Sequence, residues 1–221
     1  MERPHILSLN EFYHLYTRGV DKRIIFNDES DRKRFESLLF LFNQNKSISF
    51  RDIKAEDFFV LEKRGEPIVS IGAWCLMPNH FHLLVKETVE GGISKFMGKV
   101  LTAYSMYFNK KYKRTGSLFE STFKSEHVDT DNYLKYISAY IHLNPLSIDF
   151  PEWKRGKVDQ KEAVKFLDIY PHSSLLDYKE GNNRAEKNII TPGVFPQYHK
   201  AFKDMINDYV DWIEIKNEKF T

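Results

Sequence analysis

Apolar and polar residues alternate along short stretches of the chain, which is the pattern of β-strands with one buried face. The stretch 12–20, FYHLYTRGV, alternates in this way and is rich in aromatic residues. Residues 67–77 and 80–87 predict two more strands, joined as a hairpin by a turn at Pro78–Asn79. We expect a fourth strand over 117–128, SLFESTFKSEHV.

Other stretches repeat apolar residues every three or four positions, the spacing of an amphipathic helix. The predicted helices cover 31–42, 93–108 and 131–144. Residues that can cap a helix N-terminus precede the first and the third: Asp28 or Ser30, and Asp129 or Thr130. Gly91–Gly92 breaks the chain before the second helix, and Pro145 ends the third.

The order strand, helix, strand, strand, helix, strand, helix predicts an α+β protein with a ferredoxin-like antiparallel sheet. We expect helices on one face of the sheet and a further helix after its last strand. The predicted main domain covers residues 8–149, and 150–221 form a partly helical C-terminal extension whose strongest helical pattern is at 198–213. Residues 43–66 are polar and mixed, which predicts a loop or small insertion.

Composition narrows the class of protein. Of 221 residues, 42% are hydrophobic, which suits one core of ordinary size. The longest apolar run is far short of the roughly 20 residues of a membrane span, and the N-terminus MERPHILSLNEF lacks the apolar core of a secretory signal. A single cysteine, Cys75, excludes an intrachain disulfide. We therefore expect a cytoplasmic protein without a membrane partner.

The charge of +2 predicts no partner, but its distribution is uneven. Residues 91–125 hold seven basic side chains and one acidic side chain, a net charge of +6, whereas residues 150–221 hold twelve of each. A localised basic segment is expected of a surface that binds phosphates. A solvated helix face is an equally good interpretation from charge alone.

Two histidines stand in the predicted strand 80–87. Side chains alternate on a strand, so His80 and His82 project from one face and Phe81 from the other. Imidazoles in this arrangement can share a metal ion. The competing interpretation is a pair of ordinary polar residues on a solvated face, although the apolar flanking sequence favours a site, because buried imidazoles need partners.

The last predicted helix offers residues that would complete such a site. Tyr140 and Asn144 are four residues apart and share a helix face. Asn144 would supply an oxygen ligand and Tyr140 a nucleophile, although a phenol attacks poorly unless it is activated. A divalent ion with open positions would polarise a phosphate oxygen. The other interpretation of Tyr140 is a packing residue, common in a chain with 12 tyrosines.

At these residues the sequence closely resembles the single-tyrosine HUH transposases, specifically the REP-associated tyrosine transposase branch. The histidine, hydrophobic, histidine motif is His80–Phe81–His82 inside MPNHFHLLVKE. Three further segments resemble the family in the same order: YHLYTRGVDKRIIFNDESDRKRF, GSLFESTFKSEHV and YISAYIHLNPL. The resemblance covers roughly residues 12–148, with a fainter echo in YPHSSLLDY.

The resemblance implies that His80, His82 and Asn144 bind a metal and that Tyr140 is the nucleophile. The family cleaves single-stranded DNA, leaves a 5′-phosphotyrosine link and a free 3′-hydroxyl, and rejoins strands by the reverse attack. It implies Mg²⁺ or Mn²⁺, although imidazole, amide oxygen and water also suit Zn²⁺. The expected partner is single-stranded or hairpin DNA. A homodimer stays open, because the wider class includes dimers and this branch includes monomers.

In such an enzyme the basic residues would line the approach of the DNA backbone and give affinity rather than sequence choice. The expected DNA contacts are Arg18, Lys95, Lys99, Lys110, Lys111, Lys113, Arg114 and Lys124. The chain departs from the family at Ser121–Thr122, where relatives often carry a glycine and a basic residue. Tyr136 lies four residues before Tyr140, as in two-tyrosine HUH enzymes, and we interpret it as a packing or substrate-supporting residue.

The main prediction is therefore a metal-dependent tyrosine transposase. One alternative is a catalytically degenerate relative that binds structured nucleic acid without cutting it, against which the intact set of four site residues argues. The other is a metal-dependent hydrolase that uses activated water, for which Tyr140→Phe would keep activity.

Overall fold

The computed structural model describes residues 7–46, 48, 58–155, 157–199, 201 and 203–209. Its four antiparallel strands form one sheet in the order β2-β3-β1-β4. The strands are β1 (Phe12–Arg18), β2 (Val69–Met77), β3 (His80–Glu87) and β4 (Lys124–Val128). The α-helices are α1 (Glu29–Leu41), α2 (Gly92–Lys111), α3 (Asp131–Leu143) and α4 (Gln160–Ile169). This order of elements and strands confirms the predicted ferredoxin-like α+β fold.

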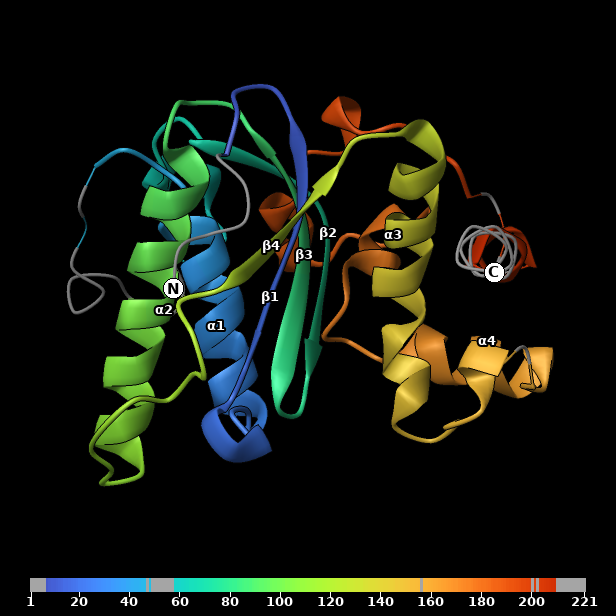
Figure 1. Cartoon of the computed structure of the whole chain (residues 1–221), viewed down its shortest axis with the longest axis horizontal. Coiled ribbons are helices and arrows are strands. Elements are labelled where there is room, and N and C mark those ends of the chain that lie inside the picture. The colour runs from blue at the N-terminus through green and yellow to red at the C-terminus, as the bar shows by residue number, and fades with distance from the viewer. Residues whose placement is uncertain are drawn as a thin grey trace, which may run out of the picture.

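The sheet carries helices on both faces (Figure 1). Helices α1 and α2 cover one face, where strand residues such as Leu15 and Phe81 pack with Phe35 and Tyr104 in the main core. Helix α3 covers the other face, where Ile137 and its neighbours pack on a smaller apolar cluster. Among the described residues no helix is long and apolar enough to cross a membrane.

The helix caps resolve the two choices that the sequence left open. The Asp28 carboxylate accepts a hydrogen bond from the Asp31 amide at 3.0 Å and caps α1. The Thr130 hydroxyl accepts one from the Tyr133 amide at 3.2 Å and caps α3. Each satisfies one of the amides that a helix N-terminus leaves without an intrahelical partner.

Strand β4 is shorter than predicted. It begins at Lys124, whereas the preceding residues 117–123 turn back across the end of β1 and pair with it only through a bridge between Gly19 and Phe119. Apolar residues in that segment, Leu118 and Phe123, are buried without forming a strand. The apolar pattern therefore predicted burial correctly but not the type of structure over the first half of 117–128.

A bulge in β2 allows apolar side chains from both ends of the strand to pack in the main core. The register with β3 shifts between Ile71 and Ala73, so Gly72 is an extra residue. Ile71 and Trp74 both face α1 and α2 as a result, while Ala73 joins the cluster under α3. A Cβ on Gly72 would lie 2.4 Å from the ring of Phe195, so a larger residue there would force that ring to move.

The C-terminal extension packs on the sheet edge and on α3. Its backbone pairs with β2, as the amide of Leu76 donates to the His172 carbonyl at 2.9 Å and that of Thr191 to the Ile71 carbonyl at 2.8 Å. Helix α4 was not predicted, because only Ala163 and Leu167 mark its buried side. The predicted helix 198–213 is helical over 203–209 and begins later than predicted, because residues 198, 199 and 201 are not helical. Residues 200, 202 and 210–213 lie outside the described residues, as do 47 and 49–57 of the predicted insertion 43–66. The domain boundary at 149/150 stays a prediction.

Candidate active site

Polar side chains of β1, β3 and β4 form a surface beneath α3, which we call the polar floor. The strand registers set Tyr16 opposite both His82 and Lys124, and Arg18 opposite His80. Residues directly opposite on antiparallel strands point to the same face, so these side chains gather on the face that α3 covers. The floor and α3 enclose a cavity of about 670 Å³, and Tyr140 and Asn144 are among the α3-side residues that line it.

The two predicted histidines lie side by side in this cavity, with ring centroids 5.0 Å apart and ring planes nearly perpendicular. Each has its Nδ1 atom engaged. Nδ1 of His80 lies 2.6 Å from the Asn79 side-chain oxygen, and Nδ1 of His82 lies 2.9 Å from Nε2 of His14. The buried Nε2 of His82 has no hydrogen-bond partner within the described part of the chain.

Burial keeps these imidazoles neutral at physiological pH. Desolvation lowers the pKa of His80 to about 4, assisted by the nearby positive charge of Arg18. Burial likewise holds the pKa of His82 well below its ordinary value. A neutral imidazole keeps one nitrogen lone pair, which is the form that binds a cation.

Tyr140 stands over the histidines from α3. Its ring centroid lies 5.3 Å from that of His82, in an edge-to-face arrangement. Burial raises the pKa of the Tyr140 phenol, and the Asn144 side chain opposes that rise. Asn144 is buried and lines the same cavity as Tyr140 and His80, and its Nδ2 atom has no hydrogen-bond partner among the described residues. The structure thus brings together the four residues that the sequence singled out.

Tyr136 belongs to the aromatic wall of the cavity. Its ring stacks on Tyr140 with centroids 5.9 Å apart and planes inclined by 21°. Tyr209, from the C-terminal extension, stacks on both rings. Tyr140 makes a ring contact with His82. The interpretation of Tyr136 as a packing or substrate-supporting residue stays a prediction.

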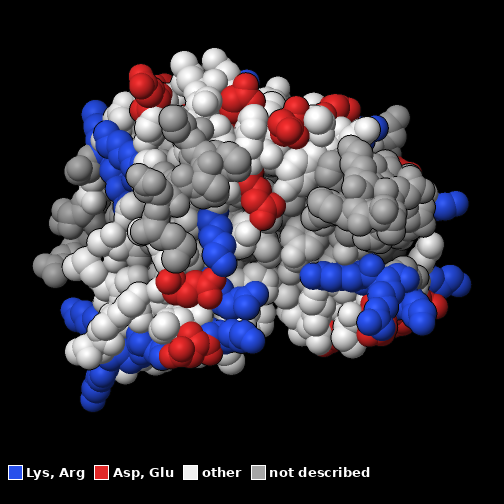
Figure 2. Space-filling view, in the orientation of Figure 1, with Lys and Arg blue, Asp and Glu red and all other residues white. Residues whose placement is uncertain are grey.

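Basic side chains surround the cavity, although fewer of them come from the predicted set than expected. Of the eight predicted DNA contacts, Arg18 and Lys124 line it. Lys154, from the extension, was not predicted, and its ammonium lies 5.2 Å from the centroid of the Tyr140 ring. Figure 2 shows Lys and Arg side chains on both sides of the indentation at the bottom of the view, with Asp and Glu between them.

Several other predicted DNA contacts are bonded within the fold. Lys99 donates to the carbonyl of Gln44 at 2.6 Å, beyond the end of α1. Lys111 donates to Asp28 and to the buried Asp31. The guanidinium of Arg114 donates to the Asn109 side chain at 2.6 Å. Lys95 binds the exposed Asn45, and Lys110 and Lys113 are exposed on the surface. A DNA-binding role for these six residues stays a prediction.

The donor set fits a divalent cation. No group of three or more His, Cys, Asp and Glu side chains able to hold a metal occurs among the described residues. A site here would instead combine two imidazoles with the amide oxygen of Asn144. The orphaned Nε2 of His82 supports this assignment, because a buried imidazole nitrogen without a partner is costly unless something binds it. Two nitrogens and one oxygen do not select among Mg²⁺, Mn²⁺ and Zn²⁺.

Sequence reasoning missed part of the floor. His14, Tyr16 and Glu126 line the same cavity. The sequence does contain an indication of them. In the predicted strands HLYTR and KSEHV, they alternate with other residues and so share a sheet face with Arg18 and Lys124. Lys154 carried no comparable signal, because its place depends on how the extension folds back.

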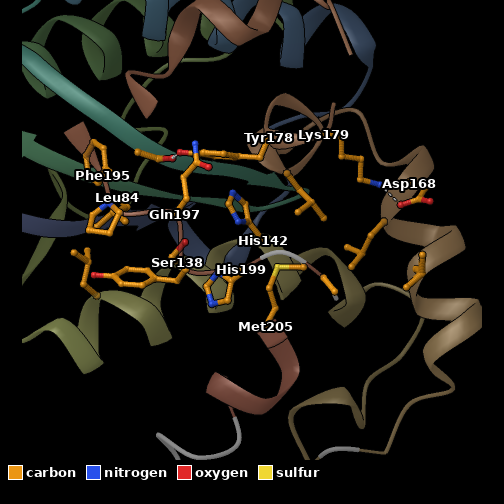
Figure 3. Close-up of a pocket in the computed structure, with 18 residues that line it drawn as sticks. Leu84, Ser138, His142, Asp168, Tyr178, Lys179, Phe195, Gln197, His199 and Met205 are labelled. Atoms are coloured by element: carbon orange, nitrogen blue, oxygen red, sulfur yellow. Dashed lines mark hydrogen bonds and ion pairs between the residues drawn. The ribbon is translucent and has the colours of Figure 1, made fainter. Parts of the chain in front are cut away.

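A second cavity, of about 290 Å³, lies on the other side of α3 (Figure 3). Its walls are largely apolar, and Leu84, Phe195 and Met205 contribute to them. His142 lines it but is held by a hydrogen bond between its Nε2 and the Ser174 hydroxyl at 2.9 Å. The four candidate site residues line the larger cavity.

The comparisons with known proteins agree with this arrangement. Residues 60–144, which contain both histidines, Tyr140 and Asn144, match the family model described as transposase IS200 like. The chain resembles the IS200-like transposases. This match confirms the resemblance that the motifs indicated.

The fold has a counterpart among solved structures. A REP-associated tyrosine transposase bound to a REP hairpin superposes with a TM-score of 0.50 over 84% of this chain and 90% of that one, at 13% identity. A transaldolase of Campylobacter jejuni subsp. doylei is 24% identical over 205 residues, which are 90% of this chain. The chain spans 59% of that protein's length, so its activity is not carried over.

Proposed function

We propose that this protein is a DNA strand-transfer enzyme that cleaves and rejoins single-stranded DNA through a covalent link to Tyr140. The observation that carries the proposal is the position of Tyr140 over the His80–His82 pair, in a cavity that Asn144 also lines. All four side chains come from one chain, so one copy supplies a complete set. The match of residues 60–144 to a transposase family supports the same reaction.

The proposed step is an in-line displacement at phosphorus. The Tyr140 oxygen attacks the phosphodiester and forms a P–O bond, while the bond from phosphorus to O3′ breaks. The phenol gives up its proton, and the departing O3′ gains one and leaves as a 3′-hydroxyl. The downstream strand stays on Tyr140 as a 5′-phosphotyrosine, and attack by a 3′-hydroxyl in the reverse sense rejoins DNA. The covalent link conserves the bond energy, so no nucleotide is consumed.

The chain's own groups orient this chemistry. The Asn144 side chain lowers the pKa of the phenol against the larger effect of burial, which raises it. Arg18, Lys124 and Lys154 surround the cavity and would hold backbone phosphates there. Nε2 of His80, Nε2 of His82 and the Asn144 oxygen would hold Mg²⁺ or Mn²⁺, which would supply positive charge to polarise a phosphate oxygen. Hairpin-bearing DNA is the proposed substrate, because the solved counterpart of this fold binds a REP hairpin.

An adduct assay tests the proposal. A hairpin-bearing strand from DNA flanking the gene, labelled at its 5′ or 3′ end, is incubated with Mg²⁺ or Mn²⁺ and with wild-type protein, Tyr140→Phe or Tyr136→Phe. We expect an SDS-resistant adduct that carries the 3′ label and a free fragment that carries the 5′ label. Tyr140→Phe should abolish both products, and Tyr136→Phe should keep both.

Other outcomes point to the other functions. Loss of the adduct with both variants, each tested alone, would favour a two-tyrosine mechanism. Cleavage without an adduct that survives Tyr140→Phe would favour the hydrolase. Tight binding of the hairpin without cleavage at any metal concentration would favour the degenerate, binding-only relative.

A further inference from the structure

A chain of polar contacts connects His82 to two further residues of the cavity, His14 and Glu126. Nδ1 of His82 lies 2.9 Å from Nε2 of His14, and the two rings are stacked with centroids 5.0 Å apart. On the far side of His14, Nδ1 lies 3.8 Å from a carboxylate oxygen of Glu126. The contacts therefore run in the order Glu126 carboxylate, His14 imidazole, His82 imidazole.

The Glu126 carboxylate is itself fixed in place. The Tyr16 hydroxyl donates to one of its oxygens at 2.8 Å, and the Tyr133 hydroxyl donates to the other at 2.8 Å. The strand register sets Glu126 directly opposite His14 on neighbouring strands, so the backbone also holds the two together. The negative charge therefore sits at one defined end of the His14 ring.

The contact between the two imidazoles permits only two proton arrangements when both rings are neutral. In the first, Nδ1–H of His82 donates to Nε2 of His14, which leaves the lone pair of His82 Nε2 directed into the cavity. In the second, Nε2–H of His14 donates to His82, and the proton of His82 then sits on Nε2 and blocks it. A carboxylate beside Nδ1 of His14 favours a proton on that nitrogen, which selects the first arrangement.

We propose that Glu126 and His14 are positioning residues, which hold His82 in the tautomer whose Nε2 faces the cavity and can bind a divalent cation. This inference rests on the proposed function for the identity of the His82 ligand, but the tautomer itself is a property of the free protein. Neither His14 nor Glu126 is a proposed metal ligand or the proposed nucleophile. Their effect is on the affinity of the site for metal, because a histidine in the wrong tautomer must exchange its proton before it can bind.

Two measurements on the full-length protein test the inference, and neither uses DNA cleavage. The first is the ¹⁵N NMR spectrum of the histidine side chains in metal-free protein, with His82 assigned by substitution, which reports which ring nitrogen carries the proton. The second is Mn²⁺ affinity from the electron paramagnetic resonance of free Mn²⁺ during titration. The variants are Glu126→Gln, His14→Leu and His14→Gln, where glutamine offers an amide oxygen near the position of His14 Nε2. Glu120→Gln is the matched control, because it removes one carboxylate from the same cavity.

We expect wild-type His82 to carry its proton on Nδ1, and Glu126→Gln to move a measurable fraction of it to Nε2. Mn²⁺ affinity should fall about 10- to 100-fold in Glu126→Gln and His14→Leu, the range seen when such supporting groups are removed. It should stay within about threefold of wild type in Glu120→Gln and recover in part in His14→Gln. A wild-type His82 protonated on Nε2, or a Glu126→Gln variant that matches Glu120→Gln in both measurements, would overturn the inference. A wild type that binds no Mn²⁺ would instead refute the metal site of the proposed function, and the ¹⁵N spectra would still decide the tautomer.

Discussion

Replacing Lys111 by methionine should destabilise the fold, although the sequence alone predicted a DNA contact for this residue. The ammonium of Lys111 lies 2.7 Å from oxygens of both Asp28 and Asp31, and 2.7 Å from the Ser30 hydroxyl. Asp31 is completely buried, and Asp28 caps α1. Methionine keeps most of the length of the lysine side chain and removes its charge, so the change isolates the electrostatic contribution.

The expected loss of stability depends on which interactions Asp28 and Asp31 retain without Lys111. Removing one partner of a buried ion pair costs about 3–5 kcal/mol, because the other charge stays buried without compensation. Two features reduce that cost: Asp28 is half-exposed, and Asp31 still accepts hydrogen bonds from the hydroxyls of Tyr107 and Tyr112. We therefore expect a loss of about 2–3 kcal/mol, which lowers the melting temperature of a protein of this size by about 4–12 °C.

The loss should depend on pH in a defined sense. Hydrogen bonds from Lys111, and next from Ser30, hold the pKa of Asp28 far below its ordinary value. A carboxylate whose pKa is lower in the folded state stabilises the fold above its unfolded-state pKa, and that contribution disappears as the pH falls through the folded-state pKa. The difference between wild type and Lys111→Met should thus be complete at pH 7 and shrink below about pH 4.

Thermal denaturation of wild type, Lys111→Met and Lys110→Met at several pH values measures this directly. Lys110 is the adjacent lysine and is exposed, so its replacement should shift the melting temperature by no more than about 1 °C. Fluorescence anisotropy with a labelled hairpin measures DNA affinity in parallel. Equal melting temperatures for the two variants, combined with a loss of DNA affinity only in Lys111→Met, would refute the structural role of Lys111.

Three further changes test other parts of the structure. Lys154→Gln should weaken hairpin binding, measured by fluorescence anisotropy at several salt concentrations, and should reduce the slope of log affinity against log salt concentration by about one. Its melting temperature should not change. Asn43→Ala should lower the free energy of unfolding, measured by urea denaturation, by about 2–4 kcal/mol, because the Asn43 side-chain oxygen accepts hydrogen bonds from two buried backbone amides. Asn45→Ala, at an exposed position, is the control. Gly72→Ala should destabilise by about 1–3 kcal/mol through the clash with Phe195, and Phe195→Ala should relieve part of that cost in the double variant.

Local patterns predicted the elements whose periodicity extends over many residues. Helix α2 has apolar residues at regular spacing over its whole length, and its observed bounds, Gly92–Lys111, enclose the predicted 93–108. The hairpin of β2 and β3 followed from a turn at Pro78–Asn79 between two apolar runs. The bulge at Gly72 could not be predicted, because it depends on contact with Phe195 from more than one hundred residues away.

The strength of the local pattern also explains which residues of the site could be predicted. The predicted histidine ligands and the predicted nucleophile lie on a strand and a helix with strong patterns, and the spacing of residues along each element determines which of them share a face. Lys154 and Tyr209 enter the cavity from the extension, where the pattern is weak. The charge of the segment 91–125 did not indicate that Lys99 and Lys111 bond to groups within the fold. Net charge records how many charges a segment has, but not which of them are already paired.

The polar floor of the cavity depends on the register of the core, and this links stability to the proposed chemistry. His82 points toward α3 because Phe81 and Leu83 point into the main core under α1 and α2. A slip of one residue between β1 and β3 would turn all of these side chains to the opposite face, so it would bury the histidine in the core and expose apolar rings. The large apolar area on one face therefore holds His14, His82 and Glu126 in alignment on the other. A site that relies on a proton held between two imidazoles needs such a rigid floor, because small displacements break the hydrogen bond. This explains why both candidate histidine ligands and His14 stand on the central strands β3 and β1, whereas Glu126 lies on the edge strand β4 and the basic residues that would contact DNA include some on the surrounding loops.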